Sequence, residues 1–201
     1  MAAEDPGAAV RRLICLWLVV LLVACTPQRP ATGIVPELRL SPASFGASLS
    51  LTQRLTVVRI SNGAQPLAAQ APVLDAVLEV TPDALQLIAM AIGQRLMTLK
   101  WDGKELQLRR SPMLPAEVDA SHILRDVQLL YWPVEVIRSH LQPGWSLVES
   151  AQQRQLLLNG KMQVDIRYSD ALRWSGQADL NNLAEGYRLQ VESRDNGGNV
   201  P

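Results

Sequence analysis

Apolar and polar residues alternate with a period of two along most of the chain from Leu49 onward. In the clearest segment the apolar positions are Met162, Val164, Ile166 and Tyr168, and the polar positions between them are Gln163, Asp165 and Arg167. Successive side chains of a strand point to opposite faces, so this period is typical of antiparallel sheet with one buried face. Several other segments repeat it, and the sequence therefore predicts a long antiparallel sheet.

Short polar dipeptides separate some of these segments. Asp102-Gly103 and Asn159-Gly160 each lie between two alternating runs, and Asn62-Gly63 is a third such dipeptide. Asn, Asp and Gly tolerate positive φ angles, which the two-residue type I′ turn requires. We therefore expect neighbouring strands to be joined as hairpins, in a meander.

One segment has a helical period instead. Asp119 is suited to cap a helix, and the apolar residues that follow at helical spacing are Ile123, Leu124, Val127, Leu130 and Tyr131. Pro133 is suited to start a second short helix, which Pro143-Gly144 would end. The predicted fold is mainly β with a helical insertion (α+β). It is a curled antiparallel sheet, or incomplete barrel, with two short helices covering its open side.

The segment from Leu85 to Ile92 is apolar on both faces of its predicted strand. The helices, a second layer or a ligand could cover its second face, and these interpretations stay open. If a curved sheet holds an apolar ligand, the site should lie between its concave face and the insertion 119–141. The residues expected to line that cavity are Ile88, Met90, Met97, Leu99, Trp101, Leu130 and Trp132.

The N-terminal segment has the features of a bacterial lipoprotein signal. Arg11-Arg12 precede the apolar run Leu13–Val23, and Leu22-Val23-Ala24-Cys25 fits the lipobox, in which a small residue stands before the acylated cysteine. We expect cleavage between Ala24 and Cys25 and a lipid anchor on Cys25. Residues 1–9 fit poorly ahead of such a signal, which indicates an over-extended start.

The predicted organisation has four parts. Residues 1–24 are the signal peptide, 25–48 a lipidated cysteine and proline-rich tether, 49–193 the β domain and 194–201 a disordered tail. Thr26 follows the cysteine, where aspartate is the usual inner-membrane retention signal in enteric-type bacteria. We therefore expect an outer-membrane protein that faces the periplasm. Its partner through acylation is membrane lipid.

Composition and motifs exclude several classes of function. The formal net charge is zero, and no basic cluster is present to bind nucleic acid. The two histidines, His122 and His140, have no metal-binding spacing, so we expect no metal and no other cofactor. Gly144-Trp145-Ser146 lacks the second glycine of a nucleophile elbow, and no phosphate-binding loop is found. The sequence does not predict an enzyme.

The lipobox, tether, strand meander and helical insertion together resemble the fold of the lipoprotein carriers LolA and LolB. The stretches Gly93-Gln94-Arg95-Leu96, Leu99 to Gly103, Arg110-Ser111-Pro112 and Leu114 to Glu117 resemble a family of uncharacterised proteobacterial lipoproteins. That family is known only as a domain of unknown function, is similar in outline to LolB, and often has its genes beside clusters that make aryl polyene lipids. The resemblance implies a LolB-like half-barrel around an apolar cavity.

Three hypotheses follow. The first is a non-enzymatic lipoprotein that binds or transfers a lipid or acyl-type molecule, linked to aryl polyene lipid export. The second is a structural or adaptor lipoprotein with a packed core, which binds an envelope protein partner. The third is a hydrolase acting on lipid or envelope polymer, which would need a pair of titratable groups converging in a cleft.

Overall fold

The computed structural model describes residues 35–60, 71–114 and 118–197, which belong to the compact unit Gly33–Pro201. Ten strands form one antiparallel sheet, with two α-helices between the fifth and the sixth. In chain order the elements are η2 (Pro42–Phe45), β1 (Leu49–Arg59), β2 (Val73–Val80), β3 (Leu85–Ala91), β4 (Gln94–Trp101), β5 (Leu106–Arg110), α2 (Ala120–Tyr131), α3 (Val134–Ser139), β6 (Trp145–Ser150), β7 (Gln153–Leu158), β8 (Lys161–Tyr168), β9 (Gly176–Asn182) and β10 (Tyr187–Asp195).

The order of strands in the sheet is β5-β4-β3-β2-β1-β10-β9-β8-β7-β6. The first strand, β1, lies in the middle of the sheet, and β2 to β5 follow in order out to one edge. The two helices then carry the chain to the opposite edge, and β6 to β10 build back until β10 pairs with β1. Both edges stay open, so the predicted fold class, a curled antiparallel sheet with a helical insertion, is confirmed.

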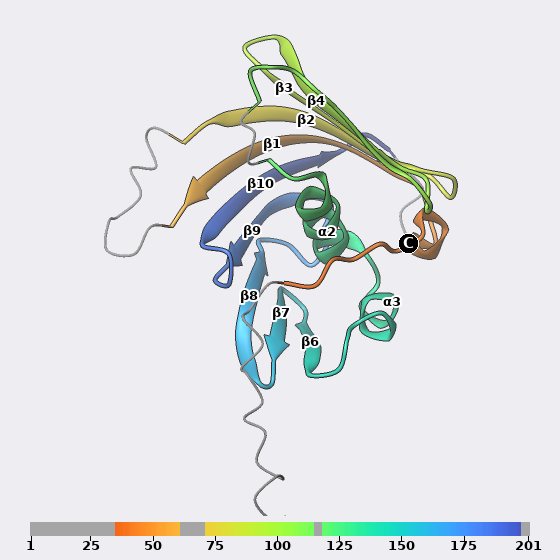
Figure 1. Cartoon of the computed structure of the whole chain (residues 1–201), viewed down its shortest axis with the longest axis vertical. Coiled ribbons are helices and arrows are strands. Elements are labelled where there is room, and N and C mark those ends of the chain that lie inside the picture. Colours follow the sequence, from red (N-terminus) through yellow and green to blue (C-terminus); the bar gives the residue numbers. More distant parts are fainter. Residues whose placement is uncertain (1–34, 61–70, 115–117, 198–201) are drawn as a thin grey trace, which may run out of the picture. The chain divides into compact units, whose positions relative to one another are not determined.

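The sheet curves around α2, which lies on its concave side (Figure 1). The helix begins as expected, because Asp119 accepts a hydrogen bond from the Ser121 amide at 2.7 Å. Every residue from Leu124 to Tyr131 is buried, including polar ones. The helix is therefore enclosed on nearly all sides by the sheet and by the segment that precedes η2.

The folded part of the chain begins earlier than predicted. Val35, Leu38, Leu40 and Phe45 are all buried, although they were expected to lie in the tether 25–48. Gln128 of α2 bonds both the amide and the carbonyl of Leu40, at 3.2 and 3.0 Å. This buried contact holds the segment across the helix, so from Val35 onward the chain is part of the core.

The C-terminal end is also more ordered than predicted. β10 extends to Asp195, and the Asn196 amide donates to the carbonyl of Ser50 at 2.9 Å. The predicted tail 194–201 therefore starts inside a strand that pairs with β1. Residues 198–201 lie outside the described part.

The hairpin turns follow the prediction in one place and depart from it in another. Asn159 and Gly160 have φ of 49° and 77°, as a type I′ turn requires. Asp102 instead accepts bonds from the amides of Lys104 and Glu105, both at 2.8 Å, and opens the turn to four residues. The two-residue turn between β3 and β4 is Ile92-Gly93, with Ile92 at φ 50° and 98 % exposed. A β-branched residue rarely adopts this conformation, because it is strained. The presence of Ile92 therefore gives no indication in the sequence that a two-residue turn lies here.

The inward face of β8 offers a test of the sheet's orientation. Ile166 is 1 % exposed and lies beside Arg154 of β7 in the sheet register. We expect Ile166→Lys to lower the free energy of unfolding by about 3 kcal/mol, because it buries a second cation beside the first. Arg167, whose side chain is 70 % exposed, is the control, and Arg167→Ala should cost less than about 1 kcal/mol. Equal losses in urea denaturation would contradict the assigned facing.

Candidate functional site

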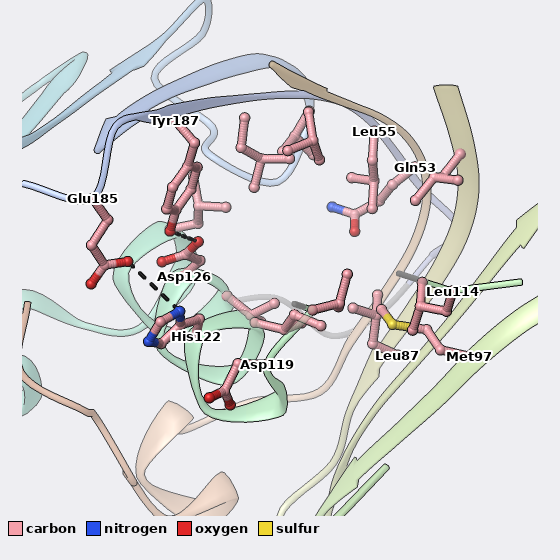
Figure 2. Close-up of a pocket in the computed structure, with 18 of the residues that line it drawn as sticks. Gln53, Leu55, Leu87, Met97, Leu114, Asp119, His122, Asp126, Glu185 and Tyr187 are labelled. Atoms are coloured by element: carbon pink, nitrogen blue, oxygen red, sulfur yellow. Dashed lines mark hydrogen bonds and ion pairs between the residues drawn. The ribbon is translucent and has the colours of Figure 1, made fainter. Parts of the chain in front are cut away.

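A cavity of about 440 Å³ lies between the concave face of the sheet and α2 (Figure 2). Its lining comes from β1, β2, β3, β4 and β10, from the turn between β9 and β10, from Leu114, and from α2 with the two residues before it. This volume is within the range of pockets that bind small molecules. The cavity is therefore large enough to hold a small-molecule ligand.

Most of the cavity wall is apolar because of how the strands and the helix are oriented. Leu55, Leu74 and Leu189 reach it from the strands, whose alternate residues face inward. Ile123, Val127 and Leu130 reach it from α2, where spacings of four and three place them on one face. The strand side chains named here are only partly buried, so they leave apolar surface facing the cavity.

Polar side chains gather at one end of the cavity, formed by His122, Asp126, Glu185 and Tyr187 (Figure 2). We call these four residues the polar end. Behind them lies Arg125, fully buried, which donates to the two carboxylate oxygens of Glu185 at 2.6 and 2.8 Å. Arg125 also donates to Asp126 at 3.1 Å and to the Tyr187 hydroxyl at 2.9 Å. One cation therefore holds three of the four residues, Asp126, Glu185 and Tyr187.

Two carboxylates share this single guanidinium. Glu185 accepts hydrogen bonds from the guanidinium with both of its oxygens. Asp126 accepts with one oxygen, so the Arg125 cation compensates the charge of Asp126 less than that of Glu185. Burial raises the pKa of Asp126 above its ordinary value, although Arg125 and the bond from Tyr187 act in the other direction. Burial and the charge of Asp126 also raise the pKa of Tyr187, so its hydroxyl stays protonated and donates to Asp126 at 2.5 Å.

A second polar group lies on the wall of the cavity. The amide nitrogen of Gln53 donates to the hydroxyls of Tyr131 and Ser193, at 2.7 and 3.0 Å. Burial raises the pKa of Tyr131 to about 12, so this hydroxyl is neutral. Within the described residues the carbonyl oxygen of Gln53 has no hydrogen-bond donor, and its amide projects toward the cavity (Figure 2). Gln53 therefore offers the cavity an acceptor.

The structure places two of the seven predicted lining residues, Met97 and Leu130, on the wall of this cavity. Ile88 and Met90 alternate with the inward-facing Leu87 and Ala89, so they belong to the other face of β3. There Ile88 lies in register with Val77 of β2. The apolar second face of β3 is thus half-buried among neighbouring strand residues and does not line the cavity.

The remaining three predicted residues are packed in the core. Leu99 is fully buried in β4, and the Trp101 indole donates to the carbonyl of Leu40 at 2.8 Å. Trp132 packs against Phe45 with ring centroids 5.1 Å apart. Each of these side chains contacts protein where a ligand was expected. Ala24 and Cys25 lie outside the described residues.

Sequence reasoning missed the polar end. Arg125 and Asp126 lie in the middle of a helix, and polar residues there usually face solvent. Glu185 and Tyr187 are about sixty positions away, at the turn between β9 and β10. The pattern holds one signal: the apolar residues of α2 occur in more than one stripe, which indicates a helix enclosed on several sides.

The described residues contain neither a metal-binding cluster nor a membrane-spanning helix. Within 35–60, 71–114 and 118–197, no three His, Cys, Asp or Glu side chains are grouped to hold a metal ion. Over the same ranges, no helix combines the length and the apolar character needed to cross a membrane.

Comparison with known protein families identifies the family of this chain. No curated protein matches the chain. A family model described as "Protein of unknown function (DUF3261)" matches residues 50–195, which begin one residue into β1 and end with β10. That match covers both helices of the insertion and the sheet from the second residue of β1 to its last strand, and the chain therefore belongs to this family.

Proposed function

We propose that this protein binds an apolar, acyl-type ligand in the cavity between the sheet and α2. The observation that carries the proposal is the cavity itself, about 440 Å³ in volume and lined mainly by aliphatic side chains. Protein interiors are close-packed, and voids much larger than a water molecule are few. An apolar ligand would remove this lining from water at a gain of roughly 25 cal/mol per Å².

The contrast with the rest of the core supports a binding role. Leu78, Leu85 and Leu99 are fully buried on the same concave face. Leu55, Leu74 and Leu189 point the same way but stay partly exposed around the cavity. The sheet is thus packed in one region and left open in another, as expected if the open region accommodates a molecule from outside.

A route for the ligand is available without breaking the sheet. One wall is α2 together with Val118 and Asp119, and α2 is held to the strands by side-chain contacts such as the bond from the Tyr168 hydroxyl to the carbonyl of Leu130. A small displacement of this wall would widen the entrance while the backbone ladders of the strands stay intact. The fully packed adaptor, which would bind an envelope protein partner, is the alternative that the binding experiment below separates from this one.

We extend the proposal to the protein's place in the cell on the sequence alone. The lipobox ending at Cys25 favours a lipoprotein anchored by acylation, and Thr26 favours the outer membrane, facing the periplasm. A LolB-like half-barrel with this address suits a non-enzymatic carrier of a lipidic molecule. The gene neighbourhood of the resembling family points to aryl polyene lipid export as its setting.

Filling the cavity should weaken ligand binding. Leu189 lines it from β10, and Leu189→Trp adds a bulky ring there. We expect the purified protein to bind decanol in isothermal titration calorimetry, and the variant to bind at least about tenfold more weakly, a loss of about 1.4 kcal/mol.

The matched control is Val148→Trp, on β6, because Val148 is exposed and does not line the cavity. This variant should bind decanol as the unaltered protein does. No binding by the folded, unaltered protein would overturn the proposal in favour of the adaptor. Equal binding by both variants would place the ligand elsewhere.

A further inference from the structure

We infer that the cavity selects its ligand by head group: it accepts an acyl chain that ends in a hydrogen-bond donor, such as an alcohol, amide or ammonium group, and rejects a carboxylate. The inference rests on the proposed function, because it assigns a chemical class to the ligand of the same cavity. It follows from the hydrogen bonds and charges of the polar end.

The charges at the polar end are unbalanced toward the negative. Among the described residues, Arg125 is the one arginine or lysine bonded to this group, and its guanidinium is divided between Glu185 and Asp126. Asp119, a third carboxylate in the lining, caps α2. A ligand carboxylate placed here would meet like charges in a partly desolvated space, where water screens their repulsion little.

The donors of this group are also already used. The single hydroxyl proton of Tyr187 goes to Asp126, and its oxygen accepts from Arg125. The carboxylate oxygens of Asp126 and Glu185 keep further lone pairs, because each ionised carboxylate can accept several hydrogen bonds. His122, whose Nδ1 is 3.8 Å from Glu185, is the one member of the polar end able to donate to a ligand. Acceptors therefore predominate.

Gln53 supports the same conclusion from the wall of the cavity. It is only 4 % exposed, and both of its amide hydrogens are engaged by the two hydroxyls. What it leaves for a ligand is a carbonyl oxygen, another acceptor. Arg59 is the arginine in the lining, but it is an exposed residue at the end of β1 and no hydrogen bond or ion pair joins it to the polar end within the described residues.

The test compares three probes that share one chain and differ in head group: decanol, decylamine and decanoate. At neutral pH we expect the protein to bind decanol and decylamine at least about tenfold more tightly than decanoate. Binding of decanoate as tight as that of decanol would overturn the inference and leave the proposed function standing. Failure of all three probes to bind the folded protein would instead overturn the proposed function.

A pair of variants assigns the selectivity to the polar end. Glu185→Gln removes a carboxylate that holds a buried arginine. We expect this variant to bind decanol no more than about threefold more tightly than decanoate. Glu149→Gln is its match, because Glu149 contacts buried Arg154 at the same 2.6 Å but lies outside the cavity, and it should keep the full preference. Asp126→Asn serves as a second variant if Glu185→Gln does not fold. An unchanged preference in the folded variant would contradict the assignment.

Discussion

Replacing Arg125 by alanine should lower the free energy of unfolding by about 5 kcal/mol, near the top of the range for breaking a buried ion pair. The side chain is fully buried and bonds Glu185, Asp126 and the Tyr187 hydroxyl at once. Its loss leaves two carboxylates close together without their cation, and removes the link between α2 and the turn that precedes β10. Urea denaturation followed by circular dichroism measures the change.

The control for this prediction is an arginine that forms an ion pair on the surface. Arg54 lies 3.7 Å from Asp75, and both side chains are more than half exposed. Arg54→Ala should cost less than about 1 kcal/mol, because solvent screens such a pair. A loss for Arg125→Ala as small as that for Arg54→Ala would contradict the role given to Arg125 as the centre of the polar end.

The fold could be predicted because its main determinant is periodic. Alternation at positions such as Val164 and Ile166 reports which face of a strand is buried, and the structure buries both. The helical period after Asp119 reports the insertion in the same way. Turns were less predictable, since Ile92 occupies a positive-φ position that sequence preference gives to Asn, Asp or Gly. There the pairing of β3 with β4 overrides the local preference.

The wall of the cavity could be predicted only in part. The expected location, between the sheet and the insertion, followed from the need to cover a curled sheet. Which residues face it depends on strand facing, and β3 is apolar on both faces, so periodicity alone did not separate Ile88 from Leu87. Met97 and Leu130 are apolar residues of β4 and α2, and both line the cavity as expected. Trp101 and Trp132 were expected beside a ligand, yet they pack against residues 40–45.

The polar end was beyond prediction for a physical reason. A buried ion pair is stable only when both partners and their hydrogen bonds are placed together, and this placement depends on tertiary structure. Along the chain, α3 and the four strands β6 to β9 separate Arg125 from Glu185, so only the folded sheet brings the two side chains together. Because this group gives the cavity most of its acceptors, the feature that would determine ligand choice under our inference cannot be found from the sequence pattern alone.

If Cys25 carries the proposed lipid anchor, its replacement should remove lipid labelling completely. The thiol is the atom that would receive the diacylglyceryl group, so Cys25→Ala should abolish incorporation of labelled palmitate in a bacterial host. The variant should accumulate as an uncleaved precursor or as unlipidated protein. Cys15→Ala is the matched control, because Cys15 lies in the apolar run of the same segment and outside the lipobox, and labelling should be normal. If Cys25→Ala were labelled normally, the proposed anchor would be wrong, while the cavity and its ligand would remain to be judged by the binding experiments alone.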